Sequence, residues 1–380
     1  MLRLPPEQLC PGMIVGRDII GTNERVLLTV GQALTERYIQ RLKDMKAPMV
    51  YVEDPLGIND SIPLVNPRTI SKAAKTLKET YEECLKTGKA NLEPVHSHVD
   101  NIIDDLLSNN SLLIGVSELK NYDDYTYQHS VNVCILAITM GITSGYNRSQ
   151  LHTLGTGALL HDIGKIYIPI EILNKPGALT DSEFKIIQKH SLDGYKIIRS
   201  SSGIPLLSAQ IALMHHERID GKGYPQHLSR DKISDYVLTV AVADMFDALV
   251  SDRPYRRAFN NQEALNIIEK HKNKKLSSQF VDILYQHVNI YSIGMVVTLN
   301  TGDIAIVTKE NNKDKKNPQV KLLFSDGLKF YDGDYKLDLA ADNKVFISDV
   351  QSAGNAEKYI SLYLSLKHDK LQYHTDNNKI

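Results

Sequence analysis

The sequence is poor in cysteine: its three copies, Cys10, Cys84 and Cys134, lie far apart and form no CxxC pair. This scarcity excludes a disulfide framework and a thiolate zinc site, so we expect reduced thiols with a structural role. Long apolar runs are also lacking, because the two most apolar segments, 131–142 and 237–250, are short and interrupted by polar residues. Neither can span a bilayer, so we expect no transmembrane anchor.

An excess of charge of either sign is lacking too. The 44 lysines and arginines nearly balance the 45 aspartates and glutamates, which leaves a net charge of −1. We therefore expect no general attraction to a nucleic acid polymer or to a membrane, and any anionic ligand must be held locally. The first residues, MLRLPPEQLC, lack the apolar core and the cleavage site of a secretory signal, so the expected location is the cytoplasm.

The length and composition favour a folded chain of several parts. With 380 residues, the chain is long enough for two or three folded units. With 42% apolar and 23% charged residues, it is far from the composition of a disordered protein. Short β-type runs around a helical stretch at 34–45 predict a small α/β module in residues 1–60. A stretch rich in Pro, Asn and Ser at 59–67 is typical of a linker.

Helical periodicity dominates the middle of the chain and predicts a fold that is mainly α. Residues 61–290 are expected to form an all-helical domain whose core is 120–290. The pattern then changes to short β-type segments, which predict a small β appendage over 291–350. Residues 351–380 form a C-terminal segment that ends in a polar tail, to which no fold is assigned.

An imidazole and a carboxylate, His161 and Asp162, end an apolar helical run within the motif HDIGK. Burying a carboxylate is costly unless a cation compensates its charge, so a metal ion is a suitable partner for Asp162. A carboxylate can bridge two cations through its two oxygens, whereas an imidazole binds one through its free nitrogen. Asp162 is therefore the candidate bridging ligand. An isolated HD dipeptide, however, is more often a helix end in which His meets backbone carbonyls beside an N-capping Asp.

Further potential ligands lie in the same region. His215 and His216 follow an apolar run, and Asp244 lies inside another, where an unpaired carboxylate would be unfavourable. Asp247 comes three residues later on roughly the same helix face, where it could orient a ligand or contact a substrate. His129 begins one helical stretch and His190 ends another, so several predicted helices offer nitrogen or oxygen ligands.

The segment from about 120 to 290 resembles the HD-GYP domain, a subgroup of the HD metal-dependent phosphohydrolases. The resemblance rests on five motifs in the order of that family: YTYQHS, HDIGK, KHSLDG, HHERIDGKGYP and VADMFDALVSDRPYRRA. One such motif could arise by chance, but not five in sequence. The resemblance implies an all-helical domain that hydrolyses the bacterial second messenger cyclic di-GMP at a cluster of iron or manganese ions. Its product would be linear pGpG, with continued hydrolysis to GMP left open.

The resemblance also implies roles for individual residues. One ion would be held by His129, His161, Asp162 and Asp244. The second ion would be held by Asp162, His190, His215 and His216, with Asp162 and a hydroxide bridging the two ions. Substrate contacts would come from Lys165 at the scissile phosphate, Tyr224 of the GYP loop, and Arg253 and Arg256. Asp162 and Lys165 would be the catalytic residues.

The sequence departs from the family pattern at one ligand position. Some members hold a third ion partly through a Glu four residues before the position of His129, where this chain has Tyr125. We therefore expect two ions, and the extent of hydrolysis beyond the linear dinucleotide stays open. Considered alone, Arg253, Arg256 and Arg257 would be a solvated charge cluster at a helix end, although their position after Asp247 weakens that interpretation.

The ligand types by themselves support a centre that activates water. Two divalent ions that share a bridging oxygen lower the pKa of bound water to near neutrality and offset the charge of a phosphorane. Nitrogen and oxygen ligands without cysteine favour ions such as iron or manganese over magnesium or calcium, and zinc fits the same ligand types. A lysine adds a point charge at a phosphate oxygen, and an arginine can bind phosphate or a guanine edge through two hydrogen bonds.

Two alternatives stay open at this point. The metal site could serve a cyclic-dinucleotide-responsive interaction module with weak catalysis, although the complete ligand set argues against it. The substrate could instead be a mixed adenine-guanine ring. Protein partners through the GYP loop or the N-terminal module, and a homodimer, are compatible with the sequence. The basic run at 270–275 is interpreted as a solvated face rather than a nucleic-acid site.

Overall fold

The chain forms two compact units, one of Pro63–Asn289 and one that combines Met1–Ile62 with Ile290–Ile380. The division into four parts that the sequence suggests stays a prediction. Among the described residues, no helix has both the length and the apolar character that crossing a membrane requires. The computed structural model describes residues 2–4, 6, 9, 11–16, 18–20, 26–45, 50–53, 64–88, 90–109, 112, 125–251, 258–311, 314–341 and 344–377.

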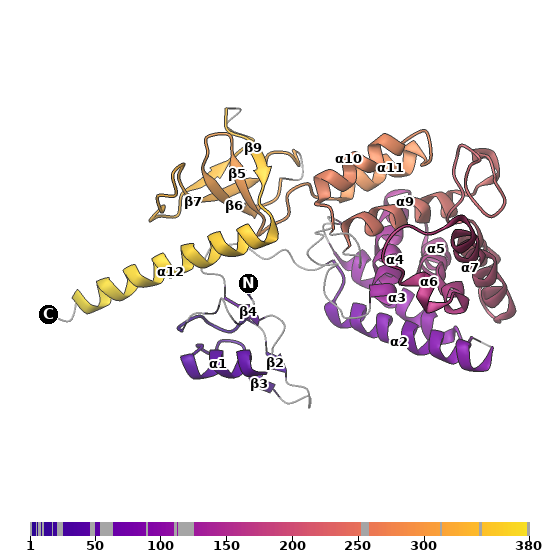
Figure 1. The fold of residues 1–380 in the computed structure, drawn as a ribbon, viewed down its shortest axis with the longest axis horizontal. Helices are drawn as coiled ribbons and strands as arrows, with labels where there is room; N and C mark the ends of the chain where they lie inside the picture. The colour runs from indigo at the N-terminus through magenta and orange to yellow at the C-terminus, as the bar shows by residue number, and fades with distance from the viewer. Residues whose placement is uncertain are drawn as a thin grey trace. The chain divides into compact units, whose positions relative to one another are not determined.

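The unit Pro63–Asn289 is built from helices in its described part, which confirms the predicted all-helical domain (Figure 1). The α-helices are α2 (Pro67–Thr87), α3 (Glu93–Ser108), α4 (Tyr125–Thr143), α5 (Arg148–Leu160), α6 (Ile170–Leu173), α7 (Asp181–Ser200), α8 (Leu206–Met214), α9 (Asp235–Val250), α10 (Asn261–His271) and α11 (Ser278–His287). Two 3₁₀ helices, η3 (Ile163–Tyr167) and η4 (Arg230–Lys232), lie between them.

The inner helices of this unit are apolar on nearly every side. Most positions of α5 and α9 are buried, as expected for helices without a polar face. Helix α5 packs against α4 and α8, and α9 packs against the same two helices. His161 and Asp162, which directly follow α5, are buried in the interior, where any polar group needs a partner. The buried thiols of Cys84 and Cys134 are free, and Cys10 lies outside the described residues.

Close backbone contact between η3 and α7 depends on Gly164 in the motif HDIGK, which lies against Gly194 in the motif KHSLDG. A Cβ on Gly164 would lie 2.0 Å from the carbonyl oxygen of His190 and 2.5 Å from the backbone nitrogen of Gly194. No side chain fits in that space, so only glycine allows η3 to lie directly against α7. This contact brings the residue before η3, Asp162, next to His190.

The second unit is a mixed α/β structure, which confirms the predicted α/β module and β appendage. Its strands and helices are β1 (Leu2–Leu4), β2 (Ile19–Ile20), β3 (Val26–Leu28), α1 (Glu36–Asp44), β4 (Val50–Val52), β5 (Val296–Leu299), β6 (Ile304–Lys309), β7 (Gln319–Phe324), β8 (Lys336–Asp338), β9 (Ile347–Val350) and α12 (Ala353–Asn377). Strands β8-β7-β6-β5-β9 form an antiparallel sheet in that order, and β1 pairs with β4 and β2 with β3.

The two chain segments of this unit share one apolar core. Buried residues of the N-terminal segment, including Leu34 and Val52, belong to the same cluster as Ile306, Phe324 and Tyr363 of the C-terminal segment. Helix α12 also extends to Asn377, through most of the polar tail to which the sequence assigned no fold.

Candidate metal centre

The carboxylate of Asp162 lies between two groups of histidines. Its Oδ2 atom is 3.3 Å from Nε2 of His161 and 3.8 Å from Nε2 of His129. Its Oδ1 atom is 3.5 Å from Nε2 of His190 and 3.8 Å from Nε2 of His215. The two oxygens of one carboxylate thus face two different sets of imidazoles, which is the arrangement that a ligand bridging two ions requires.

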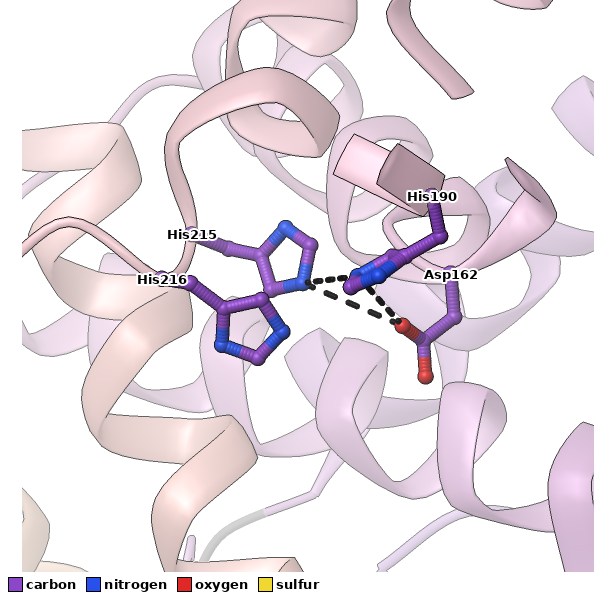
Figure 2. Close-up of side chains that lie close together, drawn as sticks. All are labelled: Asp162, His190, His215 and His216. Atoms are coloured by element: carbon purple, nitrogen blue, oxygen red, sulfur yellow. Dashed lines mark hydrogen bonds and ion pairs between the residues drawn. The ribbon is translucent and has the colours of Figure 1, made fainter. Parts of the chain in front are cut away.

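All seven candidate ligands predicted from the sequence meet at this place. Figure 2 shows one group of them. His190 lies on α7, and His215 and His216 directly follow α8. Ligand atoms lie within 4.8 Å of one another in each of three groups: Asp162 with His190, His215 and His216; Asp162 with His129 and His161; and Asp244 with His161 and His215. Asp244 Oδ1 is also 3.1 Å from Nε2 of His129.

Backbone hydrogen bonds fix the orientation of three of these imidazoles. Each donates from Nδ1 to the carbonyl oxygen of the residue three positions earlier: His161 to Ala158 at 2.7 Å, His190 to Ile187 at 2.6 Å, and His215 to Ala212 at 3.0 Å. A carbonyl oxygen can only accept, so Nδ1 carries the hydrogen in each neutral ring. The lone pair of each Nε2 atom is then directed into the centre, as a metal ligand requires.

The buried polar atoms of the centre fit a cation. Nε2 of His161 and Oδ1 of Asp162 are buried and have no hydrogen-bond partner among the described residues. Nε2 of His190 lies 3.3 Å from Nε2 of His215, and neither neutral ring has a hydrogen to share there. Unsatisfied acceptors that face one another are unfavourable unless a proton or a metal ion lies between them. The donor set of nitrogen and oxygen atoms is suitable for a divalent transition ion.

Lowered pKa values make three imidazoles of the centre neutral: His190, His215 and His216. Burial, together with the neighbouring imidazoles, lowers the pKa of His215 well below its usual value, and burial lowers the pKa of His190 as well. Burial also lowers the pKa of His216 to about 3, although Asp244 opposes this shift. These three rings are therefore uncharged near pH 7, which is the form that binds a metal.

His129 is oriented by a carboxylate instead of a carbonyl. Its Nδ1 atom donates to Oδ2 of Asp247 at 2.6 Å, and Oδ1 of the same carboxylate accepts from Nδ2 of Asn132 at 2.9 Å. Asp247 is fully buried. Of the two roles predicted for Asp247, this geometry fits the orienting role, and the substrate contact stays a prediction. Asn132 was not predicted, although it lies three residues after His129 on the same helix face.

Lys165 lies directly beside the central carboxylate. Its Nζ atom is 2.5 Å from Oδ2 of Asp162, and its side chain is partly exposed. Burial alone would raise the pKa of Asp162, but His161 and Lys165 lower it well below its usual value. Lys165 thus combines a charge at the centre with access to solvent, which suits the phosphate contact that the resemblance implies.

The GYP loop places an aromatic ring over the centre. The ring of Tyr224 lies 4.7 Å from that of His216 and 6.0 Å from that of Phe184 on α7. A Cβ on Gly223 would lie 2.4 Å from the backbone nitrogen of Arg218, so the loop can close in this way only with glycine there. Tyr224 therefore lies directly beside His216, a position that fits the predicted substrate contact.

A buried glutamate that the sequence analysis did not select holds the same loop. Glu217 is nearly fully buried, and its carboxylate accepts hydrogen bonds from the backbone nitrogens of Gln226 at 2.6 Å and Leu228 at 3.0 Å. The sequence offers one indication of this role, because Glu217 directly follows the two candidate ligands in HHERIDGKGYP.

Tyr81 of α2 is a second residue near the centre that was not predicted. Burial and the charge of Asp162 raise its pKa well above the usual value, and no sequence motif indicates it.

Two predicted contacts cannot be placed. Arg253 and Arg256, with their neighbour Arg257, lie outside the described residues, so their roles stay predictions. Tyr125 is the first residue of α4, and the number of bound ions also stays a prediction.

Comparison with known proteins agrees with this fold. Residues 104–279 match the family described as HD domain, and residues 296–358 match the KOW domain associated with HD domain. Cyclic di-GMP phosphodiesterase PA4108 of Pseudomonas aeruginosa is 37% identical over 227 residues, which cover 60% of this chain and 55% of that protein. A cyclic di-GMP phosphodiesterase of Thermotoga maritima is 43% identical over 166 residues, which cover 43% of this chain and 45% of the relative.

A third relative differs in its named substrate. The 3'3'-cGAMP-specific phosphodiesterase 1 of Vibrio cholerae is 34% identical over 190 residues, which cover 50% of this chain and 43% of that protein. The chain thus spans about half the length of the curated relatives it matches. Fold and site define a helical domain with a buried His/Asp centre that could hold metal ions. Residues 104–279 match the HD domain family, and together with these relatives the match confirms the resemblance to the HD-GYP subgroup.

Proposed function

We propose that the protein is a metal-dependent phosphodiesterase that hydrolyses cyclic di-GMP to linear pGpG. The observation that carries the proposal is the position of Asp162, whose two oxygens face two separate groups of histidines. The names of the relatives from Pseudomonas aeruginosa and Thermotoga maritima support the choice of substrate. The proposal places the reaction in the cytoplasm, where a second messenger acts.

Two divalent ions, iron or manganese, would occupy the centre. The first would be held by His129, His161, Asp162 and Asp244, and the second by Asp162, His190, His215 and His216. When bound, such ions lower the pKa of coordinated water and offset the negative charge of a phosphodiester.

The side chains of this protein would perform the remaining tasks. Asp247 keeps His129 in the required tautomer, and the three backbone-bound imidazoles need no reorganisation before they act as ligands. Lys165 would move its ammonium from Asp162 to a non-bridging oxygen of the scissile phosphate, where it offsets developing charge. Tyr224 would contact the substrate beside His216, and Arg253 and Arg256 would bind its phosphates or guanines.

Turnover by the metal-loaded chain tests the proposal. Protein loaded anaerobically with iron or manganese is incubated with cyclic di-GMP, and the products are separated by chromatography. We expect pGpG from the wild type and from Asp193→Asn, a matched carboxylate change on the partly exposed side of α7. Asp162→Asn should lose at least about a hundredfold in kcat, because it removes the charge shared by both groups of ligands. Full activity of Asp162→Asn would refute the proposed centre.

A mixed adenine-guanine ring is the second candidate substrate. The relative from Vibrio cholerae that is named for 3'3'-cGAMP supports it. Competition between the two rings for one enzyme gives the ratio of their kcat/KM values, and a pocket that reads guanine edges should penalise adenine. A ratio in favour of the mixed ring would replace the proposed substrate. Binding of either ring without turnover under every metal tested would instead indicate an interaction module.

A further inference from the structure

Apart from the metal centre, the helical unit has a cavity where the loop after His216 meets the turn after α10. The cavity measures about 610 Å³, within the range of roughly 300–1,000 Å³ that is typical of small-molecule sites. Ile219, His271, Asn273 and the acidic Asp220 line it together with five basic side chains: Arg218, Arg230, Lys270, Lys274 and Lys275. None of them is a candidate ligand of the metal centre.

The turn after α10 gathers these lysines on one wall. The backbone nitrogens of Lys274 and Lys275 both donate to the carbonyl oxygen of His271, and Asn273 adopts a left-handed conformation with φ of 58°. The backbone nitrogen of Ile219 donates to the carbonyl oxygen of Lys275 at 3.2 Å, which fastens the loop to the turn. Three lysines of the basic run, Lys270, Lys274 and Lys275, thus line the same cavity, although Lys270 and Lys274 are exposed to solvent.

The positive charge of this cavity is only partly compensated. Arg218 pairs with Asp220 at 2.5 Å and Arg230 with Asp235 at 2.8 Å. Lys270, Lys274 and Lys275 have no carboxylate partner within the described part of the chain.

Two further observations show an excess of positive charge in the lining. Burial and the charges of Lys275, Arg218 and Lys274 lower the pKa of His271. Nε of Arg218 is buried without a hydrogen-bond partner in the described residues, which leaves a charged donor to be satisfied.

We propose that this cavity binds the pyrophosphate group of a small phosphorylated ligand, separately from the metal centre. Lysine ammonium groups bind phosphate oxygens as point charges, and a guanidinium adds directed donors. Its described lining has no Phe or Tyr on which a base could stack, so recognition depends on the phosphates rather than on a nucleobase. The volume of the cavity is that of a small-molecule site, which favours a small anion over an extended polymer.

The ligand would join two segments of the helical unit. Arg218 directly follows Glu217, whose carboxylate binds the GYP loop at Gln226 and Leu228, whereas the lysines belong to α10 and its turn. A bound pyrophosphate group would therefore contact both the loop next to the metal centre and the outer helix.

Calorimetric titration of the metal-free full chain with inorganic pyrophosphate tests this proposal. The pocket variant Lys270→Glu/Lys274→Glu is compared with Lys72→Glu/Lys75→Glu, which makes the same change in net charge on exposed positions of α2. We expect the pocket variant to bind pyrophosphate at least about tenfold more weakly, because two attractive charges become repulsive, and the α2 variant to bind as the wild type does. Lys274→Gln, a milder change, should weaken binding in the same direction.

Several outcomes would overturn the proposal. Equal losses in the pocket variant and the α2 variant would show a general charge effect. A loss of binding in Lys165→Ala, with none in the pocket variant, would place the anion at the metal centre instead. Equal affinity for a glutamate-rich peptide would indicate an acidic protein partner, and no detectable heat with wild type would contradict the site outright. None of these results depends on phosphodiesterase turnover.

Discussion

Asp247 accepts a hydrogen bond from Nδ1 of His129 at 2.6 Å, although 118 positions separate the two residues in the sequence. The bond joins α4 to α9 inside the unit and turns Nε2 of His129 toward Asp244, 3.1 Å away. Asp247 in turn is held by Asn132. A carboxylate that supports a histidine in this way fixes its tautomer and raises its basicity as a ligand.

Removal of the charge at position 247 should weaken metal binding. We expect Asp247→Asn to reduce the affinity for manganese by about 10- to 100-fold, because the amide supports the imidazole less well than the carboxylate. Competition with a chromophoric chelator measures the affinity, and Asp193→Asn on α7 is the matched control. An unchanged affinity in Asp247→Asn would show that the bond has no role in the centre.

Metal binding should release a proton from His129. Burial disfavours the charged ring, but hydrogen bonds to Asp244 and Asp247 outweigh it and raise the pKa of His129 to about 10 in the absence of ions. Below that pH the ring carries a proton that an ion must displace, so the apparent affinity should rise about tenfold per pH unit between about pH 6 and 9.

Calorimetry in two buffers with different ionisation enthalpies counts this proton. At least one proton per filled centre is expected from His129, because His190, His215 and His216 are already neutral near pH 7, and conversion of bound water to hydroxide would add to this count. Release of no proton at pH 7 would contradict the proposed state of His129.

Addition of one methyl group at Gly164 should destabilise the helical unit. The Cβ of Gly164→Ala would lie 2.0 Å from the carbonyl oxygen of His190, so η3 must move away from α7. We expect the free energy of unfolding to fall by about 3 kcal/mol, as in other overpacked cores. Denaturant unfolding followed by circular dichroism measures it. The control, Gly354→Ala, has no atom within 4 Å of its Cβ and should change little; an equal effect at both sites would contradict the steric argument.

Neutralisation of Glu217 should loosen the GYP loop. Glu217→Gln keeps one acceptor but turns an amide NH₂ toward a backbone N–H, either of Gln226 or of Leu228. An unsatisfied buried donor costs about 1–3 kcal/mol, so amide exchange at these two positions should accelerate about tenfold or more. Hydrogen–deuterium exchange with mass spectrometry measures the change. Glu171→Gln, on the exposed side of α6, is the control, and unchanged exchange in Glu217→Gln would oppose the assigned role.

Much of the site could be predicted because its chemistry is visible locally. Asp244 stands in an apolar helix, and Asp162 ends another, so each carboxylate signals a partner before the fold is known. The pairing of His129 with Asp247 could not be predicted with the same certainty, because it joins residues 118 positions apart and two roles fitted the spacing.

Other features depend on tertiary structure alone. The lysines of 270–275 line a cavity only because the turn after α10 lies next to Arg218, and no local sequence pattern indicates this proximity. Helix α12 continues through a polar tail because a helix anchored by buried Tyr363 and Leu364 propagates at little further cost.

Anomalous diffraction from manganese-loaded crystals tests the central claim most directly. The account predicts two anomalous peaks on either side of the Asp162 carboxylate, one bound by His129 and the other by His190. A single peak that contacts only one oxygen of Asp162, or no peak at that carboxylate, would contradict it.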